Sequence, residues 1–173
     1  MSKTKGLIRS MSRRGTRSDK SPPVARRTRT VPEGATCERC GATFVRKTWR
    51  RGRPVSHAGL GRATWVVCPA CRQVADGEYF GCVLIRGAYA AAHEEAIRRR
   101  IGNVVARARI TQPERRLVGM TRDREVLEVL TTSQKLAHRV VQELKKTFRG
   151  RAAYAWSEDG SLFATWERDD MPA

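Results

Sequence analysis

The sequence predicts an α+β protein in which a β-rich unit, built around two Cys-x-x-Cys pairs, precedes a helix and a small ββαββ module. Three observations favour this order. The cysteine pairs lie among short β-forming segments separated by glycines. An apolar period of three and four residues follows them, and the last third alternates β-formers with one amphipathic helix.

The composition indicates a polyanionic partner. The 173 residues include 35 Lys and Arg against 17 Asp and Glu, a net charge of +18. Such an excess attracts phosphate polymers through charge pairing and counterion release, with an anionic membrane surface as the competing partner. The sequence has no apolar run of about 18 residues, and its basic start lacks the apolar segment of a secretory signal. We therefore expect a cytoplasmic protein without membrane insertion.

Four units are expected along the chain. Residues 1–35 form a basic arm, in which the near absence of acids and large apolar groups predicts disorder. Residues 36–87 form the cysteine-bearing unit, 88–110 a linking helix and 111–173 the α+β module. The arm is either a solvated tail or a segment that phosphates order on binding. Its candidate nucleic-acid contacts are Arg13, Arg14, Arg26, Arg27 and Arg29.

The two cysteine pairs predict one structural zinc ion. In each pair a tight turn can aim two thiolates at one ion, and four sulfurs close a tetrahedral site. Gly41 gives the first turn a permissive backbone, and Pro69 stiffens the second. The 27 residues between the pairs (41–67) leave room for a β-hairpin, as in a zinc ribbon. In a reducing cytoplasm thiols bind metal rather than form disulfides. The expected ligands are Cys37, Cys40, Cys68 and Cys71.

Other chemistry at the cysteines is less favoured. A Cys-x-x-Cys pair at a helix N-terminus can exchange thiols and disulfides, but we expect neither pair to open a helix. A closed four-thiolate site has no position for a reactive water, and no Asp or Glu occurs between Gly41 and Ala75. The chain is therefore not predicted to be an enzyme. Cys82 is expected to be a buried structural thiol rather than a fifth ligand.

The segment between the pairs mixes cations with aromatic rings. A zinc ion with four thiolates has a net charge of about −2, which two or three cations would compensate. The surplus predicts a surface on which arginine and aromatic planes contact phosphates and bases. A merely solvated hairpin is the alternative. The candidate nucleic-acid contacts are Arg46, Lys47, Trp49, Arg50, Arg51, Arg53, His57 and Arg62.

One helix is expected after the cysteine-bearing unit. Apolar residues from Ala88 to Ala108 keep three-and-four spacing, and Gly102 weakens the helix. The opposite side of this helix carries both acids and arginines. It is either a solvated face or a contact with RNA.

The last third predicts strand, strand, helix, strand, strand. Strands are expected at 116–120 and 126–130 and a helix at 134–148, and Asp159-Gly160 marks a hairpin turn. The hairpin aromatics can form a base-stacking platform, but the apolar face of a sheet requires such side chains anyway. They are Tyr154, Trp156, Phe163 and Trp166.

Three stretches resemble the Nmd-three family. Residues 65–71 and 79–87 are similar to the zinc-binding start of that family, and 130–133 with the following helix is similar to its next α/β module. Its members are adaptors that stay bound to the large ribosomal subunit during its maturation and export. The chain looks most like short bacterial relatives without an assigned role. Archaeal and eukaryotic members carry further Cys-x-x-Cys pairs, so nuclear export is not implied. The resemblance implies zinc ligation at the four cysteines and affinity for ribosomal RNA.

The sequence therefore predicts a non-catalytic zinc-ribbon RNA-binding protein that associates with ribosomes or rRNA and has no small-molecule substrate. In this interpretation zinc fixes the conformation of the basic hairpin, and the hairpin and the arm bind phosphates. The α+β module docks the protein on its partner or serves as a spacer. The alternative is a DNA-binding transcriptional regulator with a structural zinc, although no helix-turn-helix layout is apparent. A redox switch using Cys82 has the least support, since no set of nucleophile, base and orienting acid can be named.

Overall fold

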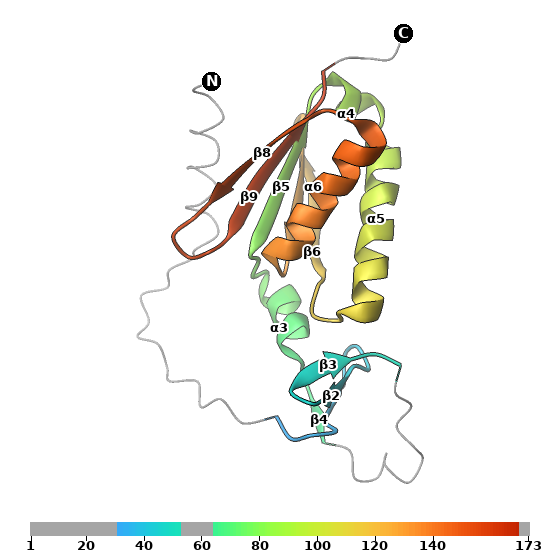
Figure 1. Ribbon diagram of the computed structural model, residues 1–173, viewed down its shortest axis with the longest axis vertical. Helices are drawn as coiled ribbons and strands as arrows, with labels where there is room; N and C mark the ends of the chain where they lie inside the picture. Colours follow the sequence, from blue (N-terminus) through green and yellow to red (C-terminus); the bar gives the residue numbers. More distant parts are fainter. Residues whose placement is uncertain (1–30, 53–63, 170–173) are drawn as a thin grey trace.

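The computed structural model describes residues 31–52 and 64–169. Within these residues it confirms the α+β class, with two sheets and four helices, and places the four cysteines in the region of the first sheet (Figure 1). The smaller sheet lies at one end of the molecule, and the larger sheet with its helices forms the rest. Several candidate contacts lie outside the described residues: Arg13, Arg14, Arg26, Arg27, Arg29, Arg53, His57 and Arg62.

The smaller sheet is a hairpin extended by two short strands. β2 (Thr43–Val45) pairs antiparallel with β3 (Thr48–Arg50) on one side and with β1 (Thr36–Cys37) on the other. β4 (Trp65–Val66) pairs in parallel with β1, which gives the order β3-β2-β1-β4. Half of the small core beneath it consists of cysteine and the rest of a few apolar side chains: Cys37, Ala42, Trp49, Cys68, Ala70 and Cys71. So small an apolar core indicates that a metal, rather than burial of hydrophobic area, stabilises this unit.

The larger sheet has five strands in the order β6-β7-β5-β9-β8. Its central strand, β5 (Gly81–Arg86), pairs antiparallel with β7 (Val126–Thr131) and in parallel with β9 (Leu162–Glu167). The edge strands are β6 (Leu117–Asp123) and β8 (Arg151–Trp156). The residues of β5 fall within the expected cysteine-bearing unit 36–87, whereas their pairing makes this strand the centre of the second sheet.

Two helices occupy the region of the expected linking helix. α4 (Ala88–Ala92) and α5 (Glu94–Thr111) are separated at His93, and Gly102 lies inside α5. The His93 ring stacks on Tyr89 at 4.0 Å, and its Nδ1 lies 3.1 Å from the Tyr89 carbonyl oxygen. The Tyr89 N–H donates to the carbonyl of Arg168, whose guanidinium lies 3.8 Å from the centre of the Tyr89 ring. These contacts hold α4 at the end of β9, so the chain turns at His93 before α5 runs along the sheet.

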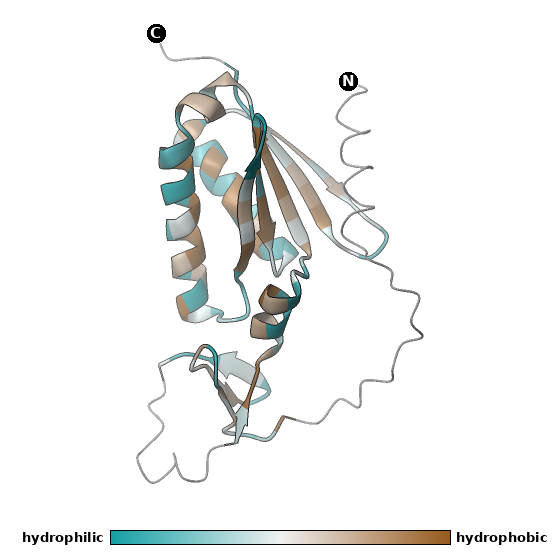
Figure 2. Ribbon diagram, turned by 180° about the vertical axis from the view of Figure 1, so that it is seen from behind, coloured by the Kyte–Doolittle hydropathy of each residue, from teal (hydrophilic) through white to brown (hydrophobic). Residues whose placement is uncertain are grey.

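The main core lies between one face of the larger sheet and the helices. α6 (Gln134–Phe148) begins as expected at Ser133, whose Oγ accepts a hydrogen bond from the Leu136 N–H. Its apolar stripe is fully buried against β5 and β9. Figure 2 shows that the distribution of hydropathy agrees with this core: hydrophilic residues lie along the outside of α5, and hydrophobic residues lie along the strands. The stripe consists of Leu136, Val140, Val141 and Leu144.

A smaller cluster lies on the opposite face of the same sheet. It contains Cys82, Leu84 and Phe163. Cys82 is 1% exposed, and burial raises the pKa of its thiol to about 12. Among the described residues, Cys82 does not belong to the metal-ligating group. Its position and its pKa agree with the expected buried structural thiol.

Substitution of two glycines of this module by alanine should change its stability in opposite directions. A Cβ on Gly81 would lie 2.5 Å from Ala137 Cβ and 2.5 Å from Thr131 Oγ1, whereas a Cβ on Gly102 would meet nothing within 4 Å. We expect Gly81→Ala to lower the free energy of unfolding by about 1–3 kcal/mol through overpacking. Gly102→Ala, inside α5, should raise it by about 1 kcal/mol. Urea unfolding followed by far-UV circular dichroism measures both, and equal midpoints for the two variants would contradict the packing of α6 on β5.

Candidate metal centre

The sulfurs of the two Cys-x-x-Cys pairs converge on one point. All four lie within 4.8 Å of one another, and both the Cys37–Cys71 and the Cys40–Cys68 sulfur distances are 3.8 Å. Zinc–sulfur bonds of about 2.3 Å in a regular tetrahedron give sulfur–sulfur distances of about 3.8 Å. Cys37, Cys68 and Cys71 are buried and Cys40 is half-buried. The donor set therefore fits one structural zinc ion with four thiolate ligands, as predicted.

The first pair sits in a tight turn after β1. The N–H of Gly41 donates to the Cys37 carbonyl at 2.8 Å, and the N–H of Cys37 donates to the Ala42 carbonyl at 2.8 Å. Gly41 has φ +68°, the left-handed conformation that glycine adopts without steric cost. The turn predicted from Gly41 is thus present, and it brings Cys40 back beside Cys37.

The second pair opens a helix, so our expectation that neither pair does so is wrong. Cys68 is the N-cap of α3 (Pro69–Asp76), and its sulfur accepts a hydrogen bond from the Cys71 N–H at 3.4 Å. Pro69 suits the first helical position, where no N–H is needed and a φ near −65° is already helical. A cysteine can replace the usual Ser or Asp as the cap, which the sequence rules for N-caps do not anticipate. Metal binding is favoured over thiol exchange here because two further sulfurs complete the tetrahedron.

Burial and hydrogen bonds act in opposite directions on these thiols. Burial raises the pKa of Cys68 and of Cys71 above the ordinary value. Burial also opposes ionisation of Cys37, but backbone hydrogen bonds, the largest from the Cys68 N–H at 3.3 Å, lower its pKa to about 6. Of Cys37, Cys68 and Cys71, Cys37 is therefore the thiol most easily ionised, and a bound zinc ion would hold all its cysteine ligands as thiolates.

Arg116 extends from the larger module to this centre. Its Nη1 lies 3.3 Å from the Cys71 sulfur and its Nε donates to the Pro113 carbonyl at 2.8 Å. Burial lowers the pKa of Arg116, but the negative charge of Cys40 and its neighbours outweighs this and raises it. A guanidinium here compensates part of the negative charge of a four-thiolate zinc site. The sequence predicts that compensation from the hairpin cations, and no sequence signal links Arg116 to a cysteine 45 residues away.

The described hairpin cations divide into two groups. Arg46 and Lys47 form the tip between β2 and β3, and they are exposed, as is Arg50 on β3. Arg51 instead donates from Nη2 to the Cys40 carbonyl at 3.2 Å, so it supports the first cysteine turn. Trp49 is buried against Phe44, with ring centres 5.3 Å apart, and belongs to the ribbon core.

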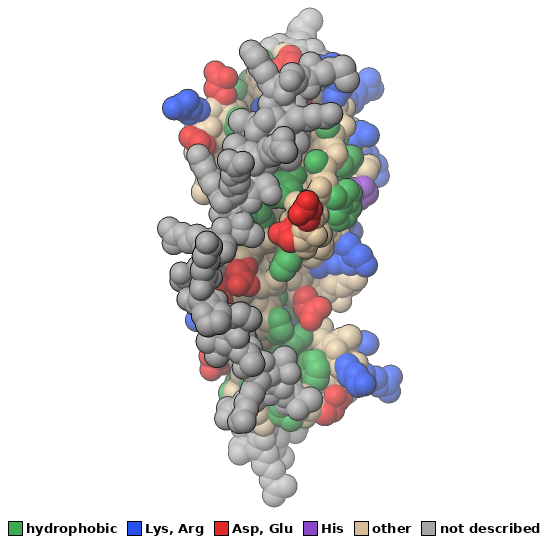
Figure 3. Space-filling view, turned by 90° about the vertical axis from the view of Figure 1, so that its left-hand side faces the viewer, with side chains coloured by type: hydrophobic (Ala, Val, Ile, Leu, Met, Phe, Trp, Pro, Cys, Tyr) green, Lys and Arg blue, Asp and Glu red, His purple; other side chains and the backbone are tan. Residues whose placement is uncertain are grey.

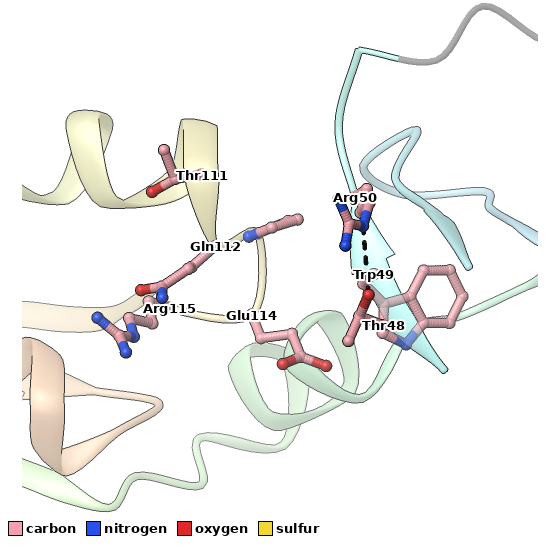
Figure 4. A pocket seen from close by; sticks show the side chains of 8 residues that line it. Thr48, Trp49, Arg50, Thr111, Gln112, Glu114 and Arg115 are labelled. Carbon is pink, nitrogen blue, oxygen red and sulfur yellow. Dashed lines mark hydrogen bonds between the residues drawn. The ribbon is translucent and has the colours of Figure 1, made fainter. Parts of the chain in front are cut away.

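A cleft separates the hairpin from the larger module. It lies between β3 and the connection from α5 to β6 (Figure 4). Arg50 and Gln112 project from opposite sides, and Arg50 Nε donates to Thr48 Oγ1 at 3.4 Å. The cleft thus has the guanidinium of Arg50 on the hairpin side and the amide of Gln112 and the carboxylate of Glu114 on the side of the larger module. Its lining consists of Thr48, Trp49, Arg50, Thr111, Gln112, Pro113, Glu114 and Arg115.

The charged side of α5 is largely engaged in ion pairs. Arg98 pairs with Glu94 at 2.7 Å and Arg99 with Glu95 at 3.0 Å. Arg100 pairs with Glu143 of α6 and Arg122 of β6 pairs with Glu94. These pairings favour the interpretation of this side as a solvated face that fixes the helix on its neighbours.

Comparison with known proteins gives no match: no protein-family model, curated protein or solved structure is significantly similar to this chain. In the described part of the chain, no helix has the length and apolar character needed to cross a membrane.

Proposed function

We propose that this chain is a non-catalytic RNA-binding protein that associates with ribosomes or rRNA, in which zinc fixes a basic hairpin as the main contact. The observation that carries the proposal is the hairpin tip. Arg46 and Lys47 occupy a two-residue turn with φ +50° and +61°. This is the turn class in which both central residues are left-handed and in which Asn-Gly is favoured.

Two cations at this tip cost conformational free energy. A residue with a Cβ in the left-handed region is less stable by about 1–2 kcal/mol, and neither side chain is glycine or asparagine. The Arg46 N–H donates to Glu33 Oε1 at 2.7 Å, which helps to hold the turn. Strained residues that a rigid frame holds in place are characteristic of binding sites. The zinc centre supplies such a frame, because β1 ends at a ligand and pairs directly with β2.

The charge of the described ribbon supports a polyanionic ligand. Its acids within 31–52 and 64–76 are Glu33, Glu38 and Asp76, and Glu33 already accepts from the hairpin backbone. The exposed cations of the ribbon are Arg39, Arg46, Lys47, Arg50, Arg51 and Arg72. This excess exceeds the charge of about −2 on a zinc ion with four thiolates, part of which Arg116 already compensates, so cations of the ribbon remain for phosphates.

RNA is favoured over duplex DNA because no long helix projects from the described part of the ribbon. α3 has eight residues, and its first turn carries a zinc ligand. A hairpin with cations at its tip suits irregular or single-stranded RNA, which proteins recognise by shape, phosphates and unstacked bases. The resemblance to the Nmd-three family supports a ribosomal RNA as the partner.

A separation-of-function variant tests the proposal. We expect the double substitution Arg46→Asn with Lys47→Gly to stabilise the hairpin by about 1–2 kcal/mol, because it relieves the left-handed strain. The same change should weaken binding, and should lower the salt dependence of log Kd by about 0.7 for each lost contact to single-stranded RNA. Thermal unfolding gives the first result. Sedimentation with purified ribosomal subunits through sucrose gradients at several salt concentrations gives the second.

The matched control is Arg99→Glu, a charge change in the first half of α5, whose other end, at Thr111, is the one that borders the hairpin. The fraction of Arg99→Glu that cosediments with ribosomal subunits should stay within about twofold of the wild-type fraction. Arg50→Glu should lower this fraction at least as much as the tip variant does. If the tip variant is stabilised and still cosediments like the wild type, the hairpin is not the contact. Preference for one duplex DNA sequence over ribosomal RNA would overturn the proposal in favour of a transcriptional regulator.

A further inference from the structure

The aromatic side chains of the C-terminal hairpin have two different environments. On β9, Trp166 is fully buried and Phe163 is buried on the opposite face of the sheet. On β8, Tyr154 is 37% exposed and Trp156 is 67% exposed. Core packing therefore accounts for the aromatics of β9 and leaves those of β8 unexplained.

The two exposed rings lie on the same face of an edge strand. Tyr154 pairs across the sheet with Ala164 and Trp156 with Leu162, and both partners belong to the main core beneath α6. Residues two apart on a strand project to the same side, roughly 7 Å apart along it. β8 is an edge strand, so the rings lie where the sheet extends past α6.

A row of polar and cationic side chains on α6 borders these rings. Tyr154 Oη accepts a hydrogen bond from Gln142 Nε2 at 3.2 Å, and its ring centre lies 5.3 Å from that of His138. At helical spacing the same side of α6 continues to Lys135 and Lys145, which are both exposed. Figure 3 shows this side of the molecule, with hydrophobic and acidic side chains on the surface and Lys and Arg along one margin.

The acidic groups nearest to this row lie outside it. Glu143 of α6 pairs with Arg100 of α5. Asp159 lies in the turn after β8, where it accepts hydrogen bonds from Ser157 Oγ and the Ser161 N–H. Glu158, exposed in the same turn, lies beyond Trp156. A polyanion would therefore lie along α6 rather than across the turn.

We infer that Tyr154 and Trp156, with the side of α6 from Lys135 to Lys145, form a second contact for single-stranded RNA. The rings stack on successive bases, and the α6 cations bind the phosphates beside them. Stacking on exposed aromatic rings is possible for every base, whatever the RNA sequence. Such a contact can therefore supplement binding by the ribbon without restricting the RNA sequence. This inference rests on the proposed function and extends it to the larger module, which has no other assigned part in binding.

The experiment uses the full zinc-bound chain and a fluorescein-labelled oligouridylate, with Kd taken from fluorescence anisotropy. Trp156→Ala is expected to weaken binding about tenfold, which corresponds to about 1.4 kcal/mol. Trp156→Phe keeps a stacking ring and should retain most of the affinity. Tyr154→Ala should also weaken binding, whereas Tyr154→Phe, which lacks only the hydroxyl, should not. Lys135→Gln with Lys145→Gln should reduce the salt dependence of log Kd.

The outcomes separate this inference from the proposed function. If the wild type does not bind the oligonucleotide at low salt, the second contact is overturned, while cosedimentation with ribosomal subunits decides the proposed function separately. If it binds, and Trp156→Ala and Tyr154→Ala bind equally well, only the second contact is overturned. If the wild type sediments as a dimer that Trp156→Ala dissociates without change in RNA affinity, β8 pairs with a second copy, which also overturns it. Since both rings are exposed, unchanged thermal unfolding of the variants is the folding control.

Discussion

Replacing Cys71 by Ser is expected to unfold the ribbon around the metal centre and to leave the five-stranded module folded. The ribbon core is half cysteine, so without the metal it has little apolar area to stabilise it. Structural zinc contributes about 10–16 kcal/mol in small zinc domains, far more than such a core can replace. Ser is a poor zinc ligand, and the loss of one sulfur of four opens the tetrahedron. The module has a separate core between its sheet and its helices.

Two measurements check this expectation. Zinc content should fall from one equivalent to well below one, and amide hydrogen exchange should become fast in residues 36–50 while α6 stays protected. Chelation of the wild type should reproduce the exchange pattern. Cys82→Ala is the matched control, because it removes a buried thiol that lies outside the metal-ligating group. That variant should keep one zinc. A zinc-free Cys71→Ser protein with a protected ribbon would show that the metal is not structural.

Trp166→Ala is expected to destabilise the larger module by about 3–5 kcal/mol. Trp166 is the largest fully buried side chain of the module, and its Nε1 donates to the Arg149 carbonyl at 2.8 Å. The substitution leaves a cavity beneath α6 and also an unsatisfied carbonyl at the start of the C-terminal hairpin. Since typical domains are stable by only 5–15 kcal/mol, the variant should be partly unfolded at physiological temperature.

Trp65→Ala provides the control for this loss of a large ring. Trp65 lies on β4 at 50% exposure, so its removal should change the free energy of unfolding by less than about 0.5 kcal/mol. Urea unfolding of both variants, with zinc content measured in parallel, gives the comparison. Both proteins should keep one zinc, because the two cores are separate. Similar destabilisation by the two substitutions would contradict the assignment of Trp166 to the core.

The sequence was sufficient for features that depend on neighbouring residues. The spacing of the cysteines identified the ligands. Each Cys-x-x-Cys turn is local and supplies two sulfurs, and two such turns together supply the four ligands of one tetrahedral zinc ion. Ser133 and the stripe after it located α6 for the same reason. The break at His93 was missed because it depends on contacts of Tyr89 with Arg168, at the far end of the chain. A helical period cannot reveal a tertiary contact of that kind.

Features that depend on strand order were beyond the sequence pattern. The apolar segment of β5 predicts a strand but not its place in a sheet. Its pairing with both β7 and β9 is what makes it the central strand. The same limit applies to the C-terminal aromatics. Trp156 and Trp166 both occur in apolar strands, but β8 is an edge and β9 lies inside the sheet, so one ring is exposed and the other buried. Arg116 reaches Cys71 only through the arrangement of the two units.

The parallel pairing of β5 with β9 also orders events during synthesis on the ribosome. β9 is the last of the described strands to be made, so a nascent chain that ends within α6 has β5 with one edge unpaired. The zinc ligands are all made before β5, so the ribbon can close on its metal while the larger sheet is still incomplete. A translational pause after Phe148 would therefore leave a folded metal domain attached to a sheet with an open apolar edge, the state most open to aggregation or to a chaperone.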